Sequence, residues 1–132
     1  MFGRAALTFL VATVAFAQSQ PSAKPIGMYN GGNETVTYAR SIRATGVSGT
    51  VVDSVESTSI PRARVQVQIQ GSGSILVDVT ADARGRFRLP KLNTGTYWLG
   101  ISASGFDISI WSLHIVRVGL RKKLVARLHI GT

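Results

Sequence analysis

From Gly46 to Thr132, short runs of β-branched and aromatic residues alternate with polar residues at every second position. Gly, Pro, Asn, Asp or Ser separates each run from the next. Because successive side chains of a strand point to opposite faces, this alternation predicts strands with one buried and one solvated face. Seven strands are predicted, at residues 47–53, 63–70, 74–80, 85–89, 96–103, 106–118 and 123–130.

The clearest alternation lies at residues 63–70. Its apolar face carries Ala63, Val65, Val67 and Ile69, and its polar face carries Arg64, Gln66, Gln68 and Gln70. No amphipathic helix is predicted between the strands, and parallel strands would need longer crossovers than these spacings allow. Residues 46–132 therefore predict an all-β domain, an antiparallel sandwich or barrel with a shared core.

Residues 18–45 have a different composition. Pro21, Pro25 and the pair Gly31 and Gly32 interrupt the segment, and it lacks sustained periodicity. We interpret residues 18–45 as a flexible linker in which a short strand can form at residues 35–39.

The first 17 residues follow the pattern of a secretory signal peptide. Arg4 precedes the apolar run 5–17, and the small residues Ala15 and Ala17 flank Phe16. This run is shorter than the roughly 20 apolar residues that a membrane-spanning helix needs. We expect cleavage after Ala17, a secreted or periplasmic product and no membrane span.

Charge narrows the range of partners. Loss of Arg4 with the signal peptide leaves 14 Lys and Arg against 6 Asp and Glu, a net charge of +8. Such a surface attracts polysaccharides, lipopolysaccharide, membrane surfaces and nucleic acids, although the charge can also serve solubility alone. Export argues against nucleic acid as the partner. Since the sequence contains no Cys, the core must form without disulfides.

An ordered series of turns and strands carries a family resemblance. The series is GTVVD at 49–53, IPRARVQV at 60–67 and TADARGRFRLPKLNTGTYWLGISASGF at 80–106. Over about residues 46 to 130 it resembles the carboxypeptidase regulatory-like domain. That family is similar to transthyretin, a seven-stranded Greek-key antiparallel β-sandwich common in exported and cell-surface bacterial proteins. Arg62 stands where the family commonly has Gly, which puts the turn at that point in doubt.

The resemblance implies an accessory or interaction module without catalytic residues or cofactors. The residue types agree, because the sequence has no Cys and only two histidines, His114 and His129, neither with metal-ligand spacing. The acidic residues are scattered, and Asp53 and Asp82 fit turn positions. The alternatives to a module of this kind are a catalytic Ser–His–Asp site and a calcium site formed by loop aspartates. We expect neither an enzyme nor a metal site.

The stretch GTYWLGISASGF at 95–106 supplies the best local clue to a binding site. Alternation places Tyr97 in phase with Leu99 and Ile101, so Tyr97 should be buried and Trp98 should face outward. The preceding strand is expected to pair with this one through the loop at 90–95, so that Arg86, Arg88 and Lys91 would join Trp98 in one cationic and aromatic surface. Alternatively, Trp98 covers a sheet edge or packs under the linker or the C-terminal strand.

Two functions remain open on this basis. An aromatic face beside hydrogen-bond donors suits a sugar ring, which predicts binding of a glycan or another anionic polymer through Trp98, Arg86, Arg88 and Lys91. The alternative is a structural or protein–protein interaction domain of a cell-envelope assembly, with edge-strand pairing as its mode of docking.

Overall fold

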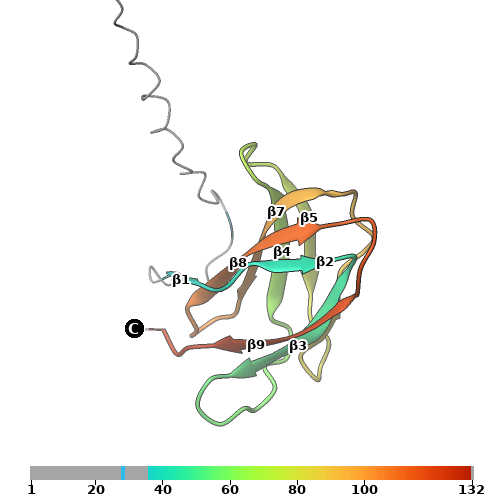
Figure 1. The fold of residues 1–132 in the computed structure, drawn as a ribbon. Helices are drawn as coiled ribbons and strands as arrows, with labels where there is room; N and C mark the ends of the chain where they lie inside the picture. The colour runs from blue at the N-terminus through green and yellow to red at the C-terminus, as the bar shows by residue number, and fades with distance from the viewer. Residues whose placement is uncertain (1–27, 29–35, 132) are drawn as a thin grey trace, which may run out of the picture.

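The computed structural model describes Met28 and residues 36–131 of the 132-residue chain, and every structural statement below concerns these residues. The predicted signal peptide and most of the predicted linker lie outside the described residues. The described chain folds into two β-sheets packed face to face, with β3 and β9 crossing beneath the larger sheet (Figure 1). None of its elements is a helix long and apolar enough to cross a membrane.

Nine strands form these sheets. They are β1 (Val36–Tyr38), β2 (Ile42–Ala44), β3 (Val47–Asp53), β4 (Arg64–Ile69), β5 (Ile75–Thr80), β6 (Arg86–Arg88), β7 (Gly95–Ser102), β8 (Ile108–Ile115) and β9 (Lys122–Leu128). The larger sheet has the order β1-β8-β7-β4-β5, with β2 also paired to β8, and the smaller has the order β6-β3-β9. The all-β sandwich predicted from the sequence is confirmed.

The two additional strands come from the segment that was interpreted as a linker. The strand expected at 35–39 is present as β1, and β2 follows it; both pair with β8 in parallel. Ile42 and Ala44 are buried while Arg43 points to solvent, so β2 adds two side chains to the core. Residues 36–45 therefore belong to the sandwich, and the description of the whole segment as a flexible linker is wrong for this part.

The sheets also contain parallel pairs that the strand spacing did not predict. The hairpin β7–β8 and the pair β4–β5 are antiparallel, but β3 and β9 run parallel over seven residue pairs. A parallel pair needs a long crossover. Here most of the domain lies between the two strands along the chain, which supplies that crossover.

A single hydrophobic core fills the space between the sheets. Alternate residues of the strands supply it, and several of its side chains are fully enclosed: Val47, Val51, Val65, Val67, Leu99, Ile101, Leu113 and Leu128. Burying one such side chain stabilises a fold by about 1.5–3 kcal/mol. With 0 Cys in the sequence, this packing is the main source of stability, as expected.

Strand β4 departs from its predicted two-faced pattern. Val65 and Val67 are buried as expected, but Gln66 and Gln68 are also buried and Ile69 is 37 % exposed. Strand β4 lies between β5 and β7, so residues of both neighbouring strands flank its outer face. The buried amides are satisfied there: Gln66 Nε2 donates to Asp78 and Gln68 Nε2 donates to the carbonyl of Gly73.

Gly85 should be the costliest of the turn glycines to replace. Its φ is +75°, and a Cβ at this position would lie 2.7 Å from the carbonyl oxygen of Val51. Gly73 has a similar φ of +78° but open space around it. We expect Gly73→Ala to lower the free energy of unfolding by about 1 kcal/mol and Gly85→Ala by roughly 2–3 kcal/mol, as measured by urea denaturation. Equal losses would show that the contact with Val51 costs nothing.

Candidate functional site

The aromatic pair Tyr97 and Trp98 divides as the alternation predicted. Tyr97 is 6 % exposed and belongs to the core, and its Oη donates a hydrogen bond to the carbonyl of Asn93 at 2.7 Å. Trp98 lies on the opposite face of β7 and is half-buried. Met28 covers part of this face, since a Cβ at Gly100, two residues further along, would lie 2.5 Å from its Sδ. One residue of the segment 18–45 therefore packs on this face of the sheet.

The predicted surface combining Trp98 with arginines does not form. Strand β6 pairs with β3 in the smaller sheet and not with β7, with Gly49 opposite Phe87. Phe87 and Tyr97 both point into the shared core. Because strand side chains alternate, Arg86 and Arg88 lie on one outer face of the sandwich and Trp98 lies on the other. The expectation that β6 and β7 form a hairpin is wrong, since the loop between them crosses from one sheet to the other.

Arg86, the first residue of β6, contacts the turn that precedes the strand. Its Nε lies 3.5 Å from Oδ2 of Asp82, and Oδ1 of Asp82 accepts hydrogen bonds from the backbone N–H groups of Arg84 and Arg86. The N–H groups of Arg86 and then Arg84 hold the pKa of Asp82 below its ordinary value of 3.8. Asp82 thus has the turn role expected from the sequence, and Arg86 is partly neutralised by it.

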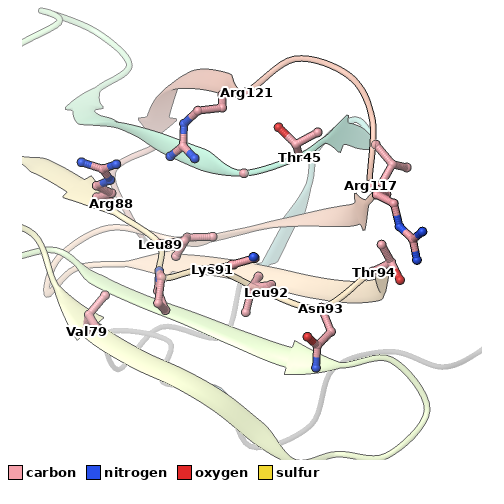
Figure 2. A pocket seen from close by; sticks show the side chains of 13 residues that line it. Thr45, Val79, Arg88, Leu89, Lys91, Leu92, Asn93, Thr94, Arg117 and Arg121 are labelled. Atoms are coloured by element: carbon pink, nitrogen blue, oxygen red, sulfur yellow. The ribbon is translucent and has the colours of Figure 1, made fainter.

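Arg88 and Lys91, in contrast, are brought together in a cleft. It opens at the end of the sandwich where the β6–β7 loop meets the β2–β3 connection and the β8–β9 loop, and its volume is about 1060 Å³. Figure 2 shows Lys91 and Arg121 directed toward this space, with Arg88 and Arg117 at its two sides. Four cationic side chains from two separate segments, residues 88–91 and 117–121, therefore surround one cleft.

These four cations lack acidic partners within the described residues. Arg88, Lys91, Arg117 and Arg121 are exposed, and the ion pairs found there, Arg64 with Asp78 and Arg86 with Asp82, involve none of them. No Asp or Glu is among the described residues that line the cleft. The cleft is consequently a concentrated source of positive potential, and low-dielectric walls strengthen such a field.

The position of Arg121 is set by a glycine. A Cβ at Gly46 would lie 2.6 Å from Nη1 of Arg121, so the guanidinium rests directly against this residue. Two backbone hydrogen bonds fix the strands around it: Thr45 N–H donates to the carbonyl of Leu120 at 3.0 Å, and Lys122 N–H donates to the carbonyl of Gly46 at 2.8 Å. The absence of a side chain at Gly46 thus lets Arg121 reach the cleft.

The opposite wall, the β6–β7 loop, is fixed at both ends. Leu89 N–H donates to the carbonyl of Val47 at 3.0 Å, and the bond from Tyr97 holds Asn93. Leu89 and Leu92 turn into the core, which leaves Lys91 and Asn93 exposed. Hydroxyl groups of Thr45 and Thr94 add neutral hydrogen-bonding partners beside the cations. Hydrogen bonds of the chain itself therefore hold this wall of the cleft in place.

The described side chains give less support to a Ser–His–Asp site or a metal site. Ser112 Oγ lies 3.5 Å from Nε2 of His114 on the outer face of β8, and it accepts a hydrogen bond from Gln70. No hydrogen bond joins His114 to a carboxylate among the residues the structure describes. The same residues contain no cluster of three or more His, Cys, Asp or Glu able to hold a metal ion.

Comparison with known proteins identifies the family. The model of the carboxypeptidase regulatory-like domain matches residues 46–128, most of the chain. The chain belongs to the carboxypeptidase regulatory-like domain family. No curated protein matches the sequence.

Solved structures agree on the fold of this carboxypeptidase regulatory-like domain. The structure of 5-hydroxyisourate hydrolase from Klebsiella pneumoniae matches it with 19 % sequence identity and a TM-score of 0.50. The match covers 67 % of this chain and 92 % of that chain. At this identity the likeness shows the transthyretin-like fold alone.

The sequence pattern indicated two of the four cations that line the cleft. It selected Arg88 and Lys91 for another surface, and it did not select Arg117, Arg121 or Thr45. The available signal was the pair of arginines that flank Val118–Leu120, at a turn where two strands end. Their convergence with Lys91 depends on which strands are neighbours, and the sequence pattern of this carboxypeptidase regulatory-like domain does not specify that.

The lowered pKa of Asp82 predicts a specific loss of stability in acid. A folded-state pKa below the unfolded value means that the carboxylate stabilises the fold above that unfolded value, 3.8, and that this contribution disappears as the pH falls through the lower folded value. Asp82→Asn retains an acceptor oxygen but cannot titrate. We expect the free energy of unfolding to fall more steeply below about pH 4 in the wild type than in D82N. Parallel pH profiles in urea denaturation would contradict this assignment.

Proposed function

We propose that this protein is an exported, non-catalytic binding module whose cleft holds a polyanionic glycan or a similar anionic polymer. The observation that carries the proposal is the convergence of Arg88, Lys91, Arg117 and Arg121 on one open cleft without a described acidic partner. The signal-peptide pattern at residues 1–17 supports export. Family membership supports a non-catalytic role, since the resemblance implies an accessory module.

The arrangement favours a polymer over a small anion. The cations come from residues 88–91 at the β6–β7 connection and from the two ends of the β8–β9 loop, so they border the cleft and do not converge on one point. A chain with repeating charges can meet several of them at once, and each contact releases counterions. Hydroxyl and amide groups from Thr45, Asn93 and Thr94 match the hydroxyl groups of a sugar.

A protein partner is the second candidate, and the edge strand β5 favours it. This strand ends the larger sheet, and its Ile75 and Leu76 are 37 % and 50 % exposed. Pairing with another strand at such an edge is a common docking mode. However, the register with β4 shifts between Val67 and Gln68, which leaves Leu76 without a partner residue, and such bulges oppose edge pairing. The cleft is therefore the better supported site.

Replacing two cleft cations should weaken binding to a charged polysaccharide. We expect Arg88→Gln with Lys91→Gln to lower affinity for dextran sulfate roughly tenfold at low salt and to reduce the salt dependence of binding. The double variant Arg62→Gln and Arg84→Gln removes the same charge from exposed positions outside the cleft and should retain most of the affinity. Affinity measured by titration at several salt concentrations tests both, with uncharged dextran as the reference ligand.

The same measurements separate the competing explanations. Equal losses in the two double variants would mean that net charge alone attracts the polymer. A loss confined to Trp98→Ala would move the site to the outer face of the larger sheet. Absence of dextran sulfate binding in the wild type, combined with a cross-linked partner that Leu76→Pro abolishes, would favour the protein-interaction candidate.

The glycine beneath Arg121 offers a test that changes no charge. We expect Gly46→Ala to displace the guanidinium, because the new Cβ would lie within 3 Å of Nη1, and to weaken dextran sulfate binding. The obstructing atoms are the far end of a flexible side chain, so the melting temperature should change little. In an Arg121→Gln background the same substitution should have no further effect on affinity. An additive effect would show that Gly46 acts independently of Arg121.

A further inference from the structure

The loop between β8 and β9 exposes two large apolar side chains at its tip. Val118 and Leu120 are each 84 % exposed, more than any other large hydrophobic residue that the structure describes. Side chains of this kind are costly to leave in water, and adjacent ones commonly mark an interaction site. They lie outside the hydrophobic core and contribute nothing to its packing.

Cations flank this apolar tip on both sides. Arg117 precedes Val118, and Arg121, Lys122 and Lys123 follow Leu120, all of them exposed. No acidic residue occurs in the sequence after Asp107. The loop therefore has an apolar tip flanked by positively charged side chains, and it contains no negatively charged side chain.

Backbone contacts hold the loop in place. Its two ends are tied to the end of β2 and to the β2–β3 connection, since Val116 N–H donates to the carbonyl of Ala44 and Lys122 N–H donates to that of Gly46. Between the apolar residues, Gly119 adopts a φ of +148°, a conformation that favours glycine. The apolar tip is consequently presented to solvent by a braced loop.

We propose that the β8–β9 loop anchors the protein to the surface of an anionic phospholipid bilayer. Val118 and Leu120 enter the boundary between headgroups and acyl chains, while Arg117, Arg121, Lys122 and Lys123 contact lipid phosphates. Charge complementarity selects this partner, because an anionic bilayer offers an apolar layer directly beneath a layer of negative charge. This role goes beyond polymer binding, and it would bring the cleft, which shares Arg117 and Arg121, close to the headgroups.

A fluorescent label on the loop tests insertion directly. The chain contains 0 Cys, so Val118→Cys can be labelled at one site with nitrobenzoxadiazole in the full-length protein. We expect its emission to rise and shift to the blue with vesicles of phosphatidylglycerol and phosphatidylcholine, but not with phosphatidylcholine alone. The matched control is Val55→Cys, since Val55 is 75 % exposed and lies beyond the end of β3 that is farther from the cleft. A local probe also separates loop insertion from membrane binding by any other part of the chain.

A second pair of variants tests the apolar contribution to affinity. Val118→Ser with Leu120→Ser should weaken sedimentation with the anionic vesicles by at least roughly tenfold, whereas Val55→Ser should not. The double variant should still bind dextran sulfate, and R88Q/K91Q should still insert its loop. Failure of the membrane role and failure of the polymer role are thereby distinguishable.

Several results would overturn the proposal. One is an unchanged emission from the label at position 118 although the protein sediments with vesicles. Another is equal response to neutral and anionic vesicles, which would remove the role of the cations. A third is concentration-dependent self-association that the double Ser variant abolishes in the absence of vesicle binding, because the apolar tip would then contact a second copy of this chain.

Discussion

The parallel pairing of β3 with β9 is the interaction on which the rest of the molecule depends. It joins the smaller sheet across seven residue pairs, from Val47 opposite Lys122 to Asp53 opposite Leu128. Without it, β9 would have no neighbour in its sheet, and Ala126 and Leu128 would lose their place in the core. The same register brings the start of β9 beside the start of β3, which places Arg121 against Gly46.

The cleft follows from two chain crossings that meet at this end of the sandwich. The β6–β7 loop carries Lys91 from the smaller sheet to the larger, and the β8–β9 loop carries Arg117 and Arg121 back. Exposed charges are partly screened by salt, with a Debye length of about 8 Å at physiological ionic strength, so their repulsion costs the fold little. A fold tolerates this concentration of cations, but its packing gains nothing from them. That is the physical reason to propose a binding role for them.

Local alternation predicted which way side chains point, but it did not predict which strands pair. Tyr97 could be placed in the core from its phase with Leu99 because that argument involves one strand only. The surface on which Arg88 lies depends on whether β6 pairs with β3 or with β7. Alternation within β6 turns Phe87 toward the core in either case, so it does not decide between the two pairings. Gln68 shows the same limit: its polarity predicted a solvated face, whereas its place between β5 and β7 buries it. The orientation of side chains on a single strand was thus predictable, and the grouping of side chains from different strands was not.

The positions of the cations on the sandwich also indicate which parts of the fold can carry a function. The fold is similar to that of a hydrolase of 19 % identity, and a fold alone does not determine an activity. Trp98, which the strand pattern singled out, lies on a face where Met28 also packs. The cleft residues instead come from strand ends and connections, where sequence can change with little cost to the core. The proposed binding function therefore rests on the β6–β7 and β8–β9 connections, where Lys91, Arg117 and Leu120 are exposed and take part in neither the ion pairs nor the core packing of the described residues.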